Sequence, residues 1–194
     1  MVLAGIGIVG SPRLLRHPDG PEEGAVNIEA SLVLAPSGFA VQFLIFGDAS
    51  LVIPTRRKPK RTDGLWEHSC LELFLKPAGG ERYFEFNFAP SRLWAAYEFD
   101  RYREGMRPLH MGAPQMLASR LGGHNFLLRA QFDWRGRAAV KSWQVGLCAV
   151  IETTGGGLSH WALAHPRGAA DFHHPDCFAL EMPAKTDSLS SPRT

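Results

Sequence analysis

The sequence predicts an all-β protein that folds as an antiparallel β-sandwich of the jelly-roll type. Apolar and polar residues alternate in short runs along most of the chain, and glycine and proline separate these runs about every ten residues. Helical periodicity is nearly absent. A period of two is typical of strands with one buried face, and many short strands separated by turn residues are typical of a sandwich.

The first predicted element is a hairpin. Residues 26–34 and 39–46 are two apolar runs rich in β-branched and aromatic side chains, and the sequence Ala35-Pro36-Ser37-Gly38 separates them. Proline and glycine between two such runs indicate a turn. We therefore expect two adjacent antiparallel strands near the start of the domain.

Three more strands are expected between residues 63 and 100, and their two faces differ in chemistry. Successive side chains of a strand point to opposite faces. One face of the first two strands is apolar and comprises Leu71, Leu73, Leu75, Phe84, Phe86 and Phe88. If the first strand starts early, the opposite face comprises Trp66, His68, Cys70, Glu72, Tyr83, Glu85 and Asn87. We expect the apolar face to lie in the core.

The orientation of Trp94 depends on the loop at Pro90-Ser91. A loop of two or four residues places Trp94 on the same face as Glu85 and Asn87. The same register sends to the core Leu93, Ala95, Tyr97 and Phe99. A loop with an odd number of residues reverses both assignments, and we predict the even-numbered loop.

The second half of the chain predicts further strands. They are expected at residues 116–121, 124–134, 143–152, 158–164 and 177–182. Two of them alternate strictly, with predicted core rows Phe126, Leu128, Ala130, Phe132 and Trp134, and Trp143, Val145, Leu147, Ala149 and Ile151. The run Gly155-Gly156-Gly157 predicts the turn between two of these strands.

The length of 194 residues fits one domain that buries a core. We expect the sandwich over residues 25–183, an N-terminal extension over 1–24, and a disordered tail over 184–194. The tail is rich in Ser, Thr and Pro, which disfavour a packed core.

Composition and charge narrow the function classes. The net charge of +2 is too small to favour nucleic acid as a partner. No stretch approaches the roughly 20 apolar residues of a membrane span, so we expect no membrane partner and a cytoplasmic location. The three cysteines, Cys70, Cys148 and Cys177, cannot all pair within the chain and form no CxxC motif, and we expect reduced thiols.

Residues 63–107 carry a resemblance to a known group. The sequences of residues 63–75, 83–91 and 94–106 resemble those of bacterial DOMON-like proteins related to family 9 carbohydrate-binding modules. The ending is similar as well, with His165-Pro166, the run Asp171-Phe172-His173-His174-Pro175, and Phe178. The resemblance implies a β-sandwich with a ligand site on one sheet face. It also implies that tryptophans and polar side chains hold a sugar, or, in haem-binding relatives, that a methionine and a histidine hold the iron.

The candidate ligand site combines flat apolar faces with hydrogen-bonding groups. Trp66 and Trp94 would stack on a sugar ring. The groups expected to bind its hydroxyls are His68, Glu72, Glu85 and Asn87, with Arg56 or Arg57 of the basic run 56–61 closing over the ligand. Alternatively, the tryptophans fill the core and the acids form an internal network with Arg82, Arg92 or Arg103.

The expected function is non-catalytic binding of a small molecule, a sugar or a sugar-like compound. One alternative is an enzyme that acts on a sugar or cell-wall derivative with Glu72 and Glu85 as acid and base. A second alternative is a module whose polar sheet face docks another protein. Which protein partner this would be does not follow from the sequence.

Metal and haem sites are weaker hypotheses. His165, Asp171 and His173 offer zinc-binding groups, but the sequence contains no HxH or HExxH pattern. A haem site would pair Met106, Met111 or Met116 with His68, His110 or His165. We expect neither a metal nor another cofactor.

Overall fold

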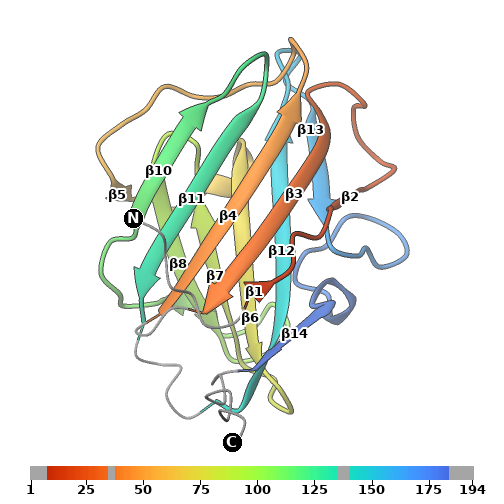
Figure 1. Cartoon of the computed structure of the whole chain (residues 1–194). Helices are drawn as coiled ribbons and strands as arrows, with labels where there is room; N and C mark the ends of the chain where they lie inside the picture. The colour runs from red at the N-terminus through yellow and green to blue at the C-terminus, as the bar shows by residue number, and fades with distance from the viewer. Residues whose placement is uncertain (1–7, 35–37, 135–139, 184–194) are drawn as a thin grey trace, which may run out of the picture.

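The protein folds as an all-β sandwich of two sheets, as predicted. The computed structural model describes residues 8–34, 38–134 and 140–183. The first sheet lies in front of the second in Figure 1. Its strand order is β1 (Ile8–Val9), β3 (Ala25–Leu34), β4 (Gly38–Gly47), β11 (Phe126–Asp133) and β10 (Gln115–Arg120).

The second sheet is the larger and carries the site described below. Its order is β2 (Leu15–Arg16), β13 (Leu158–Ala162), β12 (Ser142–Glu152), β6 (Cys70–Pro77), β7 (Tyr83–Phe88), β8 (Leu93–Phe99) and β5 (Lys60–Arg61). Two further short strands belong to this sheet. β14 (Leu180–Pro183) pairs with β12, and β9 (Arg107–Pro108) pairs with β8. The pairs are antiparallel apart from β5 and β8, which run parallel.

The predicted hairpin is confirmed, since β3 and β4 pair from Ala25 opposite Gly47 to Leu34 opposite Phe39. Residues 35–37 of its turn lie outside the described residues, as does the predicted tail, 184–194. The described part of the predicted N-terminal extension pairs with both sheets, through β1 on β3 and β2 on β13. The last strand begins at Leu180, because Pro175–Cys177 forms a 3-10 turn.

The core lies between the two sheets and follows the predicted alternation. All five residues of each predicted row on β11 and β12, with Trp134 just beyond β11, are buried. Phe86 of the second sheet stacks on Phe132 of the first, with ring centroids 4.6 Å apart. Burying a large apolar side chain stabilises the fold by about 1.5–3 kcal/mol. This face therefore carries much of the stability.

The outer face of the second sheet is buried as well, because the irregular segment of residues 163–179 covers it. Phe172, Cys177 and Phe178 of this segment belong to a second apolar cluster with Phe74 and Tyr83 of the sheet. The rings of Phe74 and Phe178 meet edge to face at 5.8 Å. Strands β6 and β7 are consequently buried on both faces, which is unusual for antiparallel strands with polar residues.

The predicted orientation of Trp94 is wrong. Phe88 pairs with Trp94, so Trp94 points into the core between the sheets and is only 5% exposed. The loop between Ala89 and Leu93 has three residues, an odd number, and Ala89 N donates to Leu93 O at 2.9 Å. Arg92 has a φ of 75°, which completes the three-residue turn with a residue type that rarely adopts this conformation.

The first strand does not have the early start on which the shared face of Trp66, His68 and Glu72 depends. Residues Leu65–Glu67 form a 3-10 turn after Gly64, whose φ is 74°, and β6 starts only at Cys70. Trp66 and His68 therefore do not alternate with Glu72 along one strand. The turn leaves Trp66 beside the outer face of the sheet and His68 on the surface.

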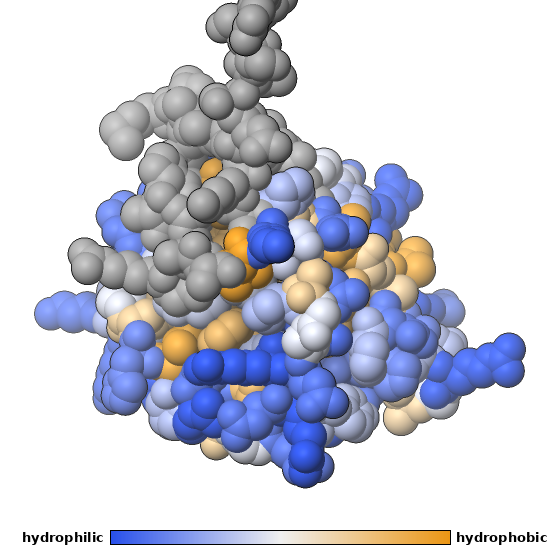
Figure 2. All heavy atoms as spheres, turned by 90° about the horizontal axis from the view of Figure 1, so that it is seen from below, coloured by the Kyte–Doolittle hydropathy of each residue, from blue (hydrophilic) through white to orange (hydrophobic). Residues whose placement is uncertain are grey.

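The surface of the described residues is mixed in character. At the end of the sandwich where β14 lies, hydrophilic side chains predominate and small apolar areas lie between them (Figure 2). None of the helical turns among the described residues is long and apolar enough to cross a membrane.

Candidate functional site

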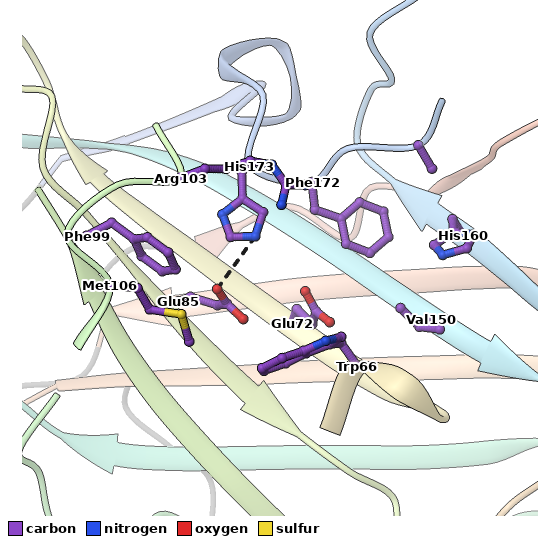
Figure 3. Close-up of a pocket in the computed structure, with 11 residues that line it drawn as sticks. Trp66, Glu72, Glu85, Phe99, Arg103, Met106, Val150, His160, Phe172 and His173 are labelled. Atoms are coloured by element: carbon purple, nitrogen blue, oxygen red, sulfur yellow. Dashed lines mark ion pairs between the residues drawn. The ribbon is translucent and has the colours of Figure 1, made fainter. Parts of the chain in front are cut away.

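A cavity of about 340 Å³ lies between the outer face of the second sheet and the covering segment 163–179. Its walls combine aromatic and apolar side chains with titratable ones (Figure 3). The lining residues are Trp66, Glu72, Glu85, Phe99, Arg103, Met106, Val150, His160, Ala170, Phe172 and His173. A partly open cavity of this size with a few converging polar groups is typical of a small-molecule site.

Two carboxyl groups form the floor. Glu72 lies on β6 opposite Asn87, and Glu85 lies on β7 opposite Phe74, so the two acids are diagonal neighbours on adjacent strands. They are 3% and 4% exposed. Diagonal neighbours have Cβ atoms within about 7–8 Å, close enough for long side chains to act on one ligand group. Figure 3 shows both carboxyl groups directed into the cavity.

The two acids differ in their hydrogen bonds. Asn87 Nδ2 donates to Glu85 Oε1 at 2.7 Å. In contrast, Glu72 Oε1 is buried and has no hydrogen-bond partner among the described residues. A buried oxygen without a partner costs roughly 1–3 kcal/mol of stability. Glu72 therefore presents an unused acceptor to the cavity.

Burial shifts both acids toward the protonated form. Desolvation raises the pKa of Glu72 well above its usual value, and the charge of nearby Glu85 raises it further, against the opposing effect of a side-chain hydrogen bond with Cys70. Desolvation also raises the pKa of Glu85, to about 7, against the opposing effects of the Asn87 hydrogen bond and the Arg103 charge. The pair can thus hold or release a proton near neutral pH.

His173 faces Glu85 from the covering segment. Its Nε2 lies 3.8 Å from Glu85 Oε2, and its Nδ1 lies 2.8 Å from the Tyr83 hydroxyl. That hydroxyl also accepts the backbone N–H of Arg103, so we assign the Tyr83 hydroxyl as the donor to His173 Nδ1. In this tautomer Nε2 carries the ring proton and faces the carboxyl group of Glu85. Burial lowers the pKa of His173 to about 4, with the Arg103 charge adding to the effect, so the ring is neutral at pH 7.

Trp66 forms one wall of the cavity and remains 39% exposed. Its ring meets that of Tyr97 edge to face at 6.0 Å. The Tyr97 hydroxyl donates to Asp63 Oδ1 at 2.5 Å, and Arg61 Nη1 lies 2.9 Å from the same oxygen. These contacts fix the turn that carries Trp66. Phe99 and Phe172 lie on the other sides of the cavity in Figure 3.

The structure brings together only part of the predicted site. Trp66, Glu72 and Glu85 line the cavity. Asn87 does not line it but donates a hydrogen bond to Glu85. Other predicted residues lie elsewhere, namely Trp94 in the core, His68 on the surface beside Glu152, and Arg56 and Arg57 outside the cavity lining. The basic run therefore does not close over this cavity.

The weak metal candidates separate in the structure. His173 lines the cavity, Asp171 accepts from Arg103 Nη2 at 2.7 Å, and His165 Nε2 lies 2.8 Å from Leu15 O. In the described part of the chain no three His, Cys, Asp or Glu side chains are placed to hold a metal ion.

The haem hypothesis is not supported by the placement of its proposed ligands. Met106 lines the cavity, whereas Met111 and Met116 pack against the core between the sheets. The histidines considered as partners, His68, His110 and His165, do not line the cavity. None of these three histidines can therefore pair with Met106 in this cavity, as the haem hypothesis requires.

Several lining residues were missed from the sequence. The even-numbered loop predicts Phe99 in the core, and the sequence suggests Arg103 only as a network partner of the acids. Phe172 and His173 follow Asp171 in a segment that predicted no strand or helix, so only its aromatic and histidine content pointed to a role. Met106 is predicted only as a haem ligand, and Val150, His160 and Ala170 give no signal for this site in the sequence.

Comparisons with known proteins show the fold. No protein-family model matches the chain, and no curated protein matches it. A crystal structure from Bacteroides uniformis ATCC 8492, described as a "putative carbohydrate-binding protein", is similar with a TM-score of 0.53. The two proteins share a fold. Their sequences are 16% identical, and the match covers 78% of this chain and 76% of the other.

Proposed function

We propose that the protein binds a small sugar-like molecule in the cavity on the outer face of its second sheet, without converting it. The observation that carries this proposal is the buried Glu72 Oε1, which has no hydrogen-bond partner among the described residues and faces a cavity beside a half-exposed tryptophan. A sugar ring offers the two complementary features, hydroxyl donors for the carboxyl groups and an apolar face for Trp66.

Two similarities support the class of ligand. The sequence of residues 63–107 resembles DOMON-like proteins related to family 9 carbohydrate-binding modules, and it contains Trp66, Glu72 and Glu85. The protein from Bacteroides uniformis with the same fold is described as a "putative carbohydrate-binding protein". Both similarities point to a ligand of the sugar-like class.

Catalysis by the same acids is a second candidate function, favoured by one observation. Glu85 has a pKa of about 7 and Glu72 a raised pKa, as general acids and bases at neutral pH require. Release of product from p-nitrophenyl glycosides would support this candidate. Stoichiometric binding without turnover supports the first proposal.

The proposal is tested by calorimetric titration of the full chain with neutral monosaccharides, amino sugars and nucleotide sugars, after a thermal-shift screen of the same compounds. We expect saturable binding of at least one class, weakened more than about tenfold by Trp66→Ala. The matched control is Leu117→Ala, which removes an exposed apolar side chain from the first sheet. Equal weakening by both variants, or binding of no compound, would contradict the proposal.

A further inference from the structure

The acids of the cavity floor have no Lys or Arg ion-pair partner among the described residues, although the charge of Arg103 lowers the pKa of Glu85. Arg103 is the guanidinium in the lining, and it is already paired with Asp171 at 2.7 Å. His173 lies 3.8 Å from Glu85 but is neutral at pH 7. Among the described residues, no Lys or Arg forms an ion pair with Glu72 or Glu85. Two buried carboxyl groups without a cation are costly when ionised.

We propose that the ligand carries a protonated amino group, as an amino sugar does, and that Glu72 and Glu85 bind this ammonium group between them. This inference rests on the proposed function and specifies its ligand class. The diagonal register directs both side chains to one region of the cavity, and Glu72 Oε1 offers it a free acceptor. An ammonium group has three donors and no acceptor, which matches a site made of acceptors.

The walls suit a cation as well. Trp66, Phe99 and Phe172 surround the carboxyl groups in Figure 3, and Met106 lies beside Phe99. Aromatic ring faces attract ammonium groups, and the attraction grows when water is excluded. A neutral hydroxyl gains less from such walls. The same wall residues also provide apolar area for the ring that carries the amine.

Binding of an ammonium group should release protons from the acids, because a cation favours their ionised form. The titratable and charged groups around them are Cys70, Tyr83, Tyr97, Arg103, Cys148, His160, Asp171, His173 and Cys177. Burial keeps the cysteines and tyrosines protonated and the histidines neutral near pH 7. The pair of acids is therefore the expected source of released protons.

The test compares probes that differ only in the amine. Calorimetric titrations of the full chain at pH 6.5 would use D-glucosamine against D-glucose, and cyclohexylamine against cyclohexanol. We expect the amine of each pair to bind at least about tenfold more tightly. Titrations in two buffers of different ionisation enthalpy should show proton release with the amines and none with the neutral compounds.

The outcomes separate this inference from the proposed function. Binding of glucose as tight as that of glucosamine would overturn the ammonium site and leave the sugar site intact. Binding of cyclohexylamine but of neither sugar would support the ammonium site and overturn the sugar assignment. Binding of none of the four probes would overturn the ammonium site, and the wider set of sugars in the first titration would then decide the proposed function.

Charge-neutral variants locate the effect. Glu72→Gln and Glu85→Gln should each remove most of the preference for the amine and abolish proton release. The matched control, Glu67→Gln, removes an exposed carboxyl group next to Trp66 and should preserve both. An unchanged amine preference in both floor variants would overturn the assignment of these residues. If a variant does not fold, the comparison of probes on the native protein still decides the inference.

Discussion

The two faces of strand β7 are both buried, yet they differ in what covers them. Phe84, Phe86 and Phe88 point between the sheets, where side chains of the first sheet fill the space. Tyr83 and Glu85 point outward, where the irregular segment 163–179 leaves a cavity of about 340 Å³. One strand thus contributes to a filled apolar core and to a partly open polar site.

This difference shows where the molecule tolerates unfavourable groups. Close packing on the inner face leaves no room for a ligand, and its apolar contacts stabilise the fold. The outer face holds two carboxyl groups with raised pKa values and one buried oxygen without a partner among the described residues. Groups that destabilise a fold are expected where they serve binding, and the core between the sheets offsets their cost.

The largest expected effect is on the free energy of unfolding, and it compares a tryptophan of the inner face of the second sheet with one beside its outer face. Trp94→Ala should lower the free energy of unfolding by about 3–5 kcal/mol, because the side chain is buried between the sheets. Trp66→Ala should lower it by about 1 kcal/mol or less, because Trp66 is half-exposed. Urea denaturation measures both. Similar losses for the two variants would mean that the faces are not distinct.

The next effect concerns the charge of Glu85. Its folded pKa of about 7 exceeds the ordinary value of 4.5, so its stabilising contribution is present below pH 4.5 and is lost as the pH rises through 7. The full change is on the order of 3 kcal/mol. The stability of Glu85→Gln relative to the native protein should therefore rise between pH 4.5 and 7. A difference that stays constant with pH would show that Glu85 titrates normally.

His173 should show the opposite dependence. Its folded pKa of about 4 lies below the ordinary 6.5, so its contribution is present above pH 6.5 and is lost as the pH falls through 4. His173→Gln should gain stability relative to the native protein as the pH falls from 6.5 to 4. Denaturation curves over this range measure it. A relative loss on acidification would indicate that the folded protein binds the imidazolium form.

The smallest expected effect is that of the basic run. Arg56 and Arg57 are exposed and lie outside the cavity lining. Replacing either with Ala should change the free energy of unfolding by less than about 0.5 kcal/mol and leave ligand affinity unchanged. The same titrations as for Trp66→Ala provide the measurement. A clear loss of affinity would show that this run contacts the ligand after all.

Much of the fold follows from the sequence because alternation is a local signal. The rows on β11 and β12 and the hairpin of β3 and β4 appear where apolar periodicity predicts them. The same alternation predicts Glu72 and Glu85 on the face away from the core. The sequence could not show that segment 163–179 covers this face, because that packing joins residues far apart in the chain.

The error at Trp94 has a specific origin. One extra residue in the turn exchanges the two faces of β8, and the turn depends on Arg92 adopting a positive φ. Glycine or asparagine at that position would have indicated such a turn, whereas arginine does not. This error also affects the predicted site. In the observed register of β7 and β8, Phe99 lines the cavity and Trp94 does not.

The most direct test of the ligand cavity is an NMR titration of the indole N–H signals with D-glucosamine and D-glucose. Of the five tryptophans, Trp66 alone lines the described cavity. Its indole signal, assigned with Trp66→Phe, should shift on saturation, together with the methyl signal of Met106, while that of core residue Trp143 should stay in place. Shifts confined to the other tryptophans, or none with either compound, would contradict a ligand site on the outer face of the second sheet.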